Sequence, residues 1–249
     1  MGIIIKSARE IEIMRQAGRI VATVLAELKS QVKPGMKTRE LDKIAERETE
    51  KLGAVPSFKG YHGYPASVCV SINDEIVHGI PGDRIMNEGD IVSIDFGAIY
   101  NDFQGDSAIT VAVGTITPEA EKLLKATEGS LMAGIQAAHA GARLGDISAA
   151  IQDYAESRGY GVVREYTGHG IGRDMHEDPQ IPNFGMPGQG PILKTGMTFA
   201  LEPMINIGDW RTRVEDDNWT VRTSDGSLSA HFEHTIVITD NGSEILTAL

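Results

Sequence analysis

Cysteine is almost missing from this 249-residue sequence, in which Cys69 is the only one. A single cysteine excludes an internal disulfide and favours a reducing compartment. A chain of this length buries most of its unfolded surface without cross-links. Residues 1–6 lack an apolar core long enough for a signal peptide, and no run approaches the roughly 20 apolar residues of a membrane span. We therefore expect a cytoplasmic protein.

Basic residues are scarce as well, with 23 Lys and Arg against 35 Asp and Glu and a formal net charge of −12. A nucleic-acid scaffold or a protein held on anionic lipid usually has a basic surface, so both classes are disfavoured. The sequence also contains no nucleic-acid recognition motif. The excess of acids leaves room for a site that gathers carboxylates around cations.

The hydrophobic pattern predicts helices and strands in alternating groups. Ser7-Ala8-Arg9-Glu10 is typical of a capping box that starts a first helix. A second helix is expected over 38–52, a third begins at Pro118, and a fourth is capped by Asp146. Short segments rich in β-branched residues are expected to form strands at 66–72, 91–96, 107–113, 197–202 and 232–238. This order predicts an α+β fold.

Three separated pairs of segments resemble each other at a near-constant offset of 106 or 107 residues. The pairs are 34–36 with 140–142, 61–63 with 168–170, and 88–95 with 195–202. One long offset that occurs once is not a solenoid repeat. We therefore predict a single catalytic domain, 1–249, built from pseudo-symmetric halves of about 1–115 and 116–249, with the active site between them.

Four acids interrupt or begin segments that are otherwise apolar: Asp95, Asp106, Glu202 and Glu233. A buried charge is unfavourable unless it is paired or bound to a metal. A hairpin centred on Tyr100-Asn101 would place Asp95 directly opposite Asp106, roughly 5 Å apart at Cβ. Two buried carboxylates at that distance need a shared proton or a cation between them. Taken singly, either aspartate is also typical of a turn cap or a salt bridge, and Glu233 of a solvated strand edge.

His169 lies between glycines in the segment 167–172, where the backbone can bend and the imidazole is free of packing. An ordinary loop histidine is the alternative. If His169 joins the four acids, the negative charges balance two divalent cations. Oxygen-rich ligation with one nitrogen suits Mn, Fe(II), Co or Zn. Bridging carboxylates can hold two such ions around one shared water and lower its pKa.

Two further histidines, His78 and His176, lie in loop-like segments and could stabilise an oxyanion; ordinary loop positions are the alternative. Aromatic and sulfur-containing side chains near these loops predict an apolar pocket suited to an unbranched thioether, with simple core filling as the alternative. They are Phe58, Tyr61, Tyr64, Cys69, Met175 and Trp219. Cys69 has no adjacent base, which argues against a nucleophilic cysteine.

Nine short motifs, spread over essentially the whole chain, contain all five candidate ligands together with His78 and His176. They are 61–65, 71–73, 78–81, 95–97, 105–107, 168–172, 176–177, 202–204 and 233–235. Together they resemble the bacterial form of the type 1 methionine aminopeptidases, metallopeptidases with the pita-bread fold. The resemblance implies a curved antiparallel sheet covered by helices. It also implies an enzyme that removes the initiator Met from nascent proteins whose second residue is small, by attack of metal-activated water on the first peptide bond.

The resemblance implies a metal-binding role for each of the five candidate ligands. Asp106 and Glu233 would bridge two divalent ions, Asp95 would chelate one of them, and His169 and Glu202 would complete the other.

The resemblance also implies roles at the substrate. Glu202 would serve as general base, His176 would contact the scissile carbonyl, and His78 would contact the amide beside it. The methionine pocket would be lined by Tyr61, Tyr64, Cys69, Met175 and Trp219. Phe58 and Met175 stand where the family often has cysteine and phenylalanine, so the shape of the pocket is expected to differ.

Two other readings remain on the sequence alone. A proline-directed aminopeptidase or dipeptidase shares the fold and ligands but usually carries a separate N-terminal domain, which we do not expect here. A metal-free pita-bread binding module would have lost ligands, whereas all five are present. The expected partner is the N-terminal Met of nascent polypeptides, and the expected state is a monomer. Transient association with the ribosome, the physiological metal and the exact second-residue specificity stay open.

Overall fold

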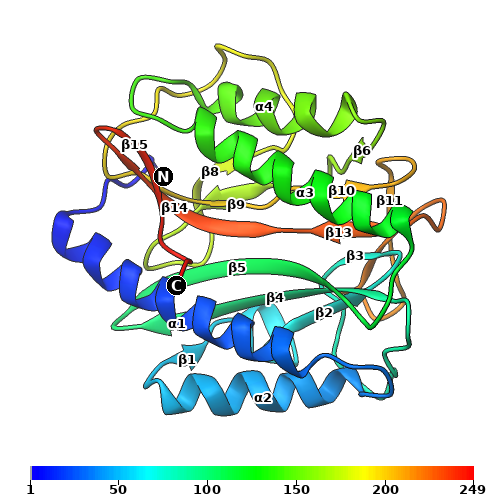
Figure 1. Ribbon diagram of the computed structural model, residues 1–249. Helices are drawn as coiled ribbons and strands as arrows, with labels where there is room; N and C mark the ends of the chain where they lie inside the picture. Colours follow the sequence, from blue (N-terminus) through cyan, green and yellow to red (C-terminus); the bar gives the residue numbers. More distant parts are fainter. Residues whose placement is uncertain (1) are drawn as a thin grey trace.

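The computed structural model describes residues 2–249 and places two pairs of helices against a central sheet (Figure 1). The helices are α1 Ala8–Gln31, α2 Thr38–Lys51, α3 Pro118–Ala137 and α4 Leu144–Glu156, with a short 3-10 helix η1 Tyr61–Gly63. The strands are β1 Val55–Pro56, β2 Cys69–Ile72, β3 Glu75–Val77, β4 Ile91–Tyr100, β5 Phe103–Ala112, β6 Gly161–Val162, β7 Gly168–Gly170, β8 Glu177–Ile181, β9 Thr198–Leu201, β10 Met204–Asn206, β11 Thr212–Val214, β12 Val221–Thr223, β13 Ser229–His231, β14 Glu233–Thr239 and β15 Gly242–Ile245.

The main sheet is antiparallel and joins strands from both ends of the chain. Its order is β1-β4-β5-β14-β9-β7-β8, with β2 paired to β4 and β15 paired to β14. Two smaller sheets have the orders β13-β10-β6 and β11-β12-β3. The antiparallel pairing and the separate helix pairs confirm the predicted α+β class. The β5–β14 contact joins the two halves of the chain.

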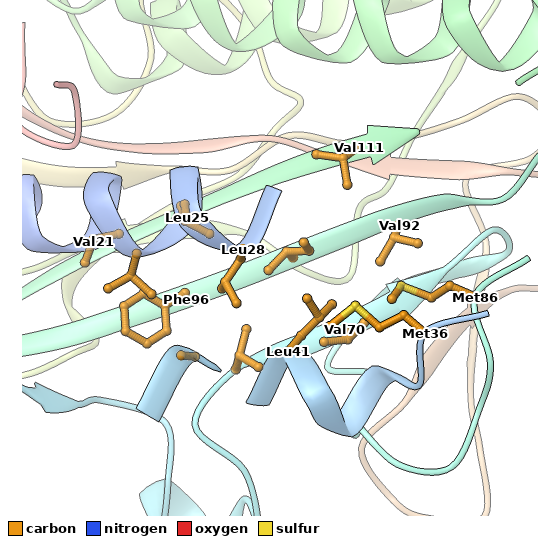
Figure 2. Close-up of a cluster of buried hydrophobic side chains, with 14 of the residues drawn as sticks. Val21, Leu25, Leu28, Met36, Leu41, Val70, Met86, Val92, Phe96 and Val111 are labelled. Atoms are coloured by element: carbon orange, nitrogen blue, oxygen red, sulfur yellow. The ribbon is translucent and has the colours of Figure 1, made fainter. Parts of the chain in front are cut away.

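The two faces of the main sheet differ in character, with apolar side chains on the face toward the helices and polar side chains on the other. On β4, Val92 and Phe96 face α1 and α2, and Figure 2 shows them with Leu25 and Leu28 of α1 and Leu41 of α2. Neighbouring side chains along a strand point to opposite faces, so the positions between Val92 and Phe96 at odd numbers face away from these helices. The helix side is therefore the core, and the other side is left for polar groups.

The second helix pair makes an equivalent core over the other half. Leu131 of α3 and Ile151 of α4 pack with Phe199 of β9 and Ile236 of β14. One helix pair on each half supports the proposal of pseudo-symmetric halves at about 1–115 and 116–249. Among residues 2–249, no helix combines the length and the apolar character that a bilayer crossing requires.

The predicted starts of α1 and α3 are confirmed, and the predicted cap of α4 is not. Ser7 forms the capping box of α1, and Thr117 caps α3 with Pro118 in its first turn. The prediction that Asp146 caps α4 is wrong, because α4 begins at Leu144 with Arg143 as its N-cap. Asp146 instead accepts the Arg143 backbone N–H at 2.7 Å from inside the first turn.

The β4–β5 hairpin differs from the predicted register. Its turn consists of Asn101 and Asp102, both with positive φ, at 46° and 66°, which is the backbone of a two-residue type I′ loop. The strands consequently pair Asp95 with Ala108 and Asp106 with Gly97. The prediction that the two aspartates lie directly opposite each other is wrong. They share one face two residues apart, as diagonal neighbours.

Candidate metal centre and substrate cavity

Three acids on β4, β5 and β14 occupy adjacent positions on the face away from the helices. Ala108 of β5 pairs with Asp95 on one side and with Glu233 on the other, so both carboxylates project beside its methyl group. Asp106 lies two residues before Ala108 and shares this face. The Thr235 hydroxyl accepts from the Asp106 backbone N–H at 3.0 Å and donates to the Asp106 carbonyl at 2.7 Å. Strand register thus brings together acids from distant parts of the chain.

Strands β7 and β9 add the remaining two predicted ligands. His169 of β7 pairs with Ala200 of β9, and Glu202 directly follows that strand, with its Oε1 3.4 Å from His169 Nε2. His169 Nδ1 lies 2.9 Å from the Gly170 carbonyl oxygen. Because a carbonyl can only accept, Nδ1 carries the proton, and the lone pair of Nε2 faces the acids. The orientation is that of a metal-binding imidazole.

The electrostatics of this cluster are unfavourable without a cation. Burial raises the pKa of Asp95, and the charge of Asp106 raises it further. Burial and the neighbouring aspartates likewise raise the pKa of Glu202 and Glu233. Burial lowers the pKa of His169 to about 3, so this imidazole is neutral and cannot balance the acids. Like charges this close need protons or cations between them.

Unpaired oxygen atoms show that the residues fit a divalent metal. Asp95 Oδ1, Asp106 Oδ1 and Glu233 Oε1 are buried without a hydrogen-bond partner among residues 2–249, which is costly for a carboxylate. Ligand atoms of Asp106, His169 and Glu233 all lie within 4.8 Å of one another. Oxygen donors with one imidazole nitrogen suit Mn, Fe(II), Co or Zn. The donor chemistry and the orphaned oxygens therefore agree.

A cavity of about 250 Å³ opens beside this cluster. All predicted ligands and all predicted substrate residues line it, together with one histidine that the sequence reasoning did not single out. The lining residues are Phe58, Tyr61, His62, Tyr64, Cys69, His78, Asp95, Asp106, His169, Met175, His176, Glu202, Trp219 and Glu233. Acids and apolar side chains thus share one space.

Sheet register also explains why the apolar part adjoins the acids. Cys69 of β2 pairs with Asp95, so its thiol points to the same face, and burial raises its pKa. Gly97 pairs with Asp106, and a Cβ there would lie 3.0 Å from both Met175 Cε and Phe58 Cε1. The missing side chain at position 97 therefore gives these two residues their place.

Aromatic contacts close the apolar end of the cavity. The Tyr64 and Trp219 rings meet edge to face with centroids 5.1 Å apart. The Tyr64 hydroxyl lies 2.9 Å from the Gly79 carbonyl oxygen and 3.2 Å from that of Val68, so its single proton is shared between two acceptors and its polar atom is satisfied. What remains exposed to the cavity is an apolar, partly aromatic wall.

His176 and His78 lie near the border between the acids and the apolar wall. The ring centroid of His176 is 4.2 Å from that of His169, and the Tyr61 hydroxyl lies 2.7 Å from His176 Nδ1. Burial lowers the pKa of His78 to about 4, and burial together with His62 lowers the pKa of His176. Both imidazoles are therefore neutral near pH 7.

The hydrogen bond between Tyr61 and His176 has a preferred direction. Burial and the Asp174 charge raise the pKa of Tyr61, so the phenol keeps its proton. The phenol O–H is more acidic than a neutral imidazole N–H and donates to Nδ1. The proton of His176 is then on Nε2, where it can be donated to a substrate oxygen.

His62 is the cavity residue that sequence reasoning missed. It is exposed, has a positive φ of 48° and places its ring 4.3 Å from that of Tyr61, centroid to centroid. Its signal was its place inside the motif 61–65, where only the tyrosines were taken as substrate-facing.

Comparisons with known proteins cover the whole chain. Residues 12–240 match the model of metallopeptidase family M24. Methionine aminopeptidase 1 of Bacillus subtilis is 57% identical over 245 residues, which span 98% of this chain and 99% of that protein. A methionine aminopeptidase of Clostridium acetobutylicum is 55% identical over 246 residues, 98% of each chain.

Solved structures give the same result at the level of the fold. The crystal structure of the methionine aminopeptidase from Thermotoga maritima matches with a TM-score of 0.98 and 48% identity over 100% of both chains. The Xaa-Pro dipeptidase from Bacillus anthracis matches with a TM-score of 0.78 at 24% identity, over 98% of this chain and 61% of that one. The second likeness concerns the fold alone.

Proposed function

This chain belongs to metallopeptidase family M24 and is a metal-dependent methionine aminopeptidase with the pita-bread fold, and we propose that the acids and histidines of the cavity carry its reaction. The observation that supports these roles is that five ligand candidates from separate strands meet the apolar wall in one cavity. The proline-directed alternative is not favoured, because relatives that match over the whole chain are methionine aminopeptidases. A metal-free module is disfavoured by the five retained ligand candidates.

We propose that the cluster holds two divalent ions. Asp106 and Glu233 would be shared between the ions, Asp95 would belong to one, and His169 with Glu202 would belong to the other. Bound divalent ions supply Lewis acidity, which polarises a carbonyl and lowers the pKa of water. Mn, Fe(II), Co and Zn all suit this donor set.

The side chains of the cavity would move the protons. Glu202 accepts a proton from the attacking water and returns it to the departing amine nitrogen, while the C–N bond of the first peptide breaks. Burial and the neighbouring aspartates raise the pKa of Glu202 when no cation is present. With cations bound the carboxylate would be deprotonated and free to accept a proton from water. His176 donates its Nε2–H to the scissile carbonyl oxygen as negative charge develops there. His78 contacts the amide beside it.

The cavity shape would set the specificity. Phe58, Tyr64, Cys69, Met175 and Trp219 offer the soft, adaptable surface that an unbranched thioether fits. A cavity of about 250 Å³ holds little beyond the methionine and its peptide bond, so we propose that the second residue is small. We further propose that the protein acts in the cytoplasm, as a monomer, on the N-terminal Met of nascent polypeptides.

Metal removal and reconstitution test this proposal directly. We expect protein treated with a chelator to lose cleavage of Met-Gly-Met-Met and to regain it with Mn, Fe(II), Co or Zn. Carboxylates and a neutral imidazole cannot replace the cation that polarises the scissile carbonyl. An X-Pro peptide that lacks an N-terminal Met serves as the control substrate and should stay intact. Cleavage that persists in chelator, or preferred cleavage of the X-Pro peptide, would contradict the proposal.

A further inference from the structure

The loop between β7 and β8, residues 171–176, carries two cavity residues whose positions matter for the reaction. Met175 is buried against the apolar wall, whereas His176 is partly open to solvent and its ring contacts those of His169 and Tyr61. The position of the His176 ring therefore also depends on where the loop backbone places it. The loop is tied to β5 through Gly172, whose carbonyl accepts the Gln104 backbone N–H at 2.8 Å. At its other end the loop is closed by backbone pairing of Glu177 with Gly170 of β7, and the side chain of Glu177 adds a further anchor.

That anchor is a buried ion pair next to His176. Glu177, the first residue of β8, accepts the Arg173 backbone N–H at 3.0 Å through Oε1, which closes the loop on itself. Its Oε2 accepts from the Lys6 ammonium group. The two side chains are only 3% and 6% exposed. A single carboxylate therefore ties the end of the loop to Arg173 in its middle and joins both to the N-terminal segment.

The N-terminal segment is itself fixed to the sheet. The Lys6 backbone N–H donates to the Gly196 carbonyl at 2.8 Å, just before β9, and in Figure 1 the segment leads directly into α1. A Cβ at Gly172 would overlap Glu177 Oε1 and lie 2.7 Å from Lys6 Nζ. The loop backbone thus wraps closely around the ion pair, with no space for a side chain at position 172.

Stability alone is a weak explanation for this pair. Replacing a buried ion pair by apolar groups is often neutral or stabilising, whereas removing one partner leaves an uncompensated buried charge. Its geometry offers a second explanation, because the backbone that Glu177 closes carries His176 one residue away. A shift of about 1 Å in a positioning group can reduce a rate by roughly 100-fold.

We propose that Lys6 and Glu177 are positioning residues, whose ion pair fixes the loop 171–176 so that His176 meets the scissile carbonyl and Met175 closes the methionine pocket. The inference rests on the proposed function, because it uses the proposed contact of His176. It makes the segment before α1 a working part of the active site, although that segment does not line the cavity.

A double-mutant cycle separates positioning from stability. We compare Lys6→Met, Glu177→Gln and the double variant for thermal unfolding temperature, metal content, kcat and KM on Met-Gly-Met-Met. Each single variant should unfold at a lower temperature, and the double variant should recover most of that loss because no charge is left unpaired. The kcat should stay reduced by about 10- to 100-fold in all three variants, with KM changed far less. A kcat that recovers together with the unfolding temperature would overturn the proposal.

Hydrogen exchange supplies a readout that does not depend on activity. Amides in 171–177 should exchange faster in the double variant, while those in α4 stay unchanged. The exposed pair Lys125 and Glu121 of α3 provides the matched control, since Lys125→Met with Glu121→Gln should alter neither kcat nor exchange in 171–177. Unchanged loop exchange in the double variant would also overturn the proposal. Cleavage by the unaltered protein and its loss in His176→Ala test the proposed function separately.

Discussion

In the proposed reaction the Glu202 carboxylate both binds a cation and exchanges a proton with water. It lies at the end of β9 with its Oε1 3.4 Å from His169 Nε2, and Asn183 donates to its backbone carbonyl at 3.1 Å. Its carboxylate is therefore placed by the backbone and not by a hydrogen bond that would compete for its oxygens. A residue placed in this way can hold a cation and still exchange a proton.

Replacing this carboxylate by an amide tests its role as base. We expect Glu202→Gln to lower kcat by about 100- to 10,000-fold, because an amide of the same shape cannot accept a proton from water. The measurement is steady-state cleavage of Met-Gly-Met-Met at saturating metal, with circular dichroism as the check on folding. Near-normal turnover in a folded, metal-loaded variant would exclude Glu202 as the base.

Tyr61 should act through His176 and not on the substrate. We expect Tyr61→Phe to lower kcat about 3- to 10-fold, the value of one hydrogen bond, because loss of the bond to Nδ1 frees the imidazole to take its other tautomer. The ring remains, so KM should change little. Tyr160→Phe, remote from the cavity, is the matched control. A change confined to KM would place Tyr61 in substrate binding only.

Individual strands were largely predictable, but the contacts between distant strands were not. The segments around Asp95, Glu202 and Glu233 were recognised because each apolar run contains a single acid. The pairing of Ala108 with both Asp95 and Glu233 depends on the β5–β14 contact, which no local pattern encodes. The residue pattern proposed the four acids and His169 as one ligand set, and the resemblance to a family supplied the role of each.

The β4–β5 hairpin shows how a local error arises. Tyr100-Asn101 was taken as the centre of the turn, whereas Asn101 and Asp102 both adopt positive φ. Asn and Asp tolerate that region better than other non-glycine residues, so the pair is the better turn signal. The shift moved the partner of each aspartate by two residues and left both on the same face, because the side-chain period is two.

The contact between α1 and β5 depends on two glycines. Gly18 of α1 faces Gly105 of β5, where a Cβ on Gly105 would lie 2.9 Å from the Gly18 nitrogen. A Cβ on Gly18 would overlap the Leu246 carbonyl. The close approach fixes the height of α1 above the strand that carries Asp106. For Gly18→Ala, helix propensity therefore predicts a gain in stability, whereas packing predicts a loss.

We expect packing to decide the effect of Gly18→Ala. Propensity alone would stabilise the helix by about 1 kcal/mol, but overpacking against backbone typically costs about 1–3 kcal/mol. The variant should therefore lose stability in urea unfolding. Thr23→Ala, at an exposed position of the same helix, is the control and should be neutral or slightly stabilising. A more stable Gly18→Ala variant would show that α1 and the segment at Leu246 can move apart.

The molecule as a whole must tolerate buried acids whose charges repel. Without metal, the folded state binds more protons than the unfolded state at any pH between the ordinary pKa of these acids, 4.5 for Glu202 and Glu233, and their raised folded values. The free energy of unfolding then falls as pH rises through that window. His169 has the opposite effect, since its lowered pKa removes stability as pH falls below 6.5. Burial raises the pKa of Asp106 to about 7, so the stability that its proton provides is lost as pH rises through 7.

Metal should reverse this slope, because it binds the deprotonated ligands and only in the folded state. We expect the metal-free protein to be less stable at pH 8 than at pH 6.5, and the gain from added Mn to be larger at pH 8. At 100 times the dissociation constant of Mn, the gain in the free energy of unfolding should be about 2.7 kcal/mol, measured by urea unfolding with and without chelator.

Two variants test whether the gain comes from the ligand cluster. Asp106→Asn should raise the stability of the metal-free protein and abolish most of the gain, whereas Asp153→Asn, at an exposed position of α4, should do neither. An equal response to Mn in both variants would mean that the ion binds outside the cluster, so the orphaned carboxylate oxygens would need another partner.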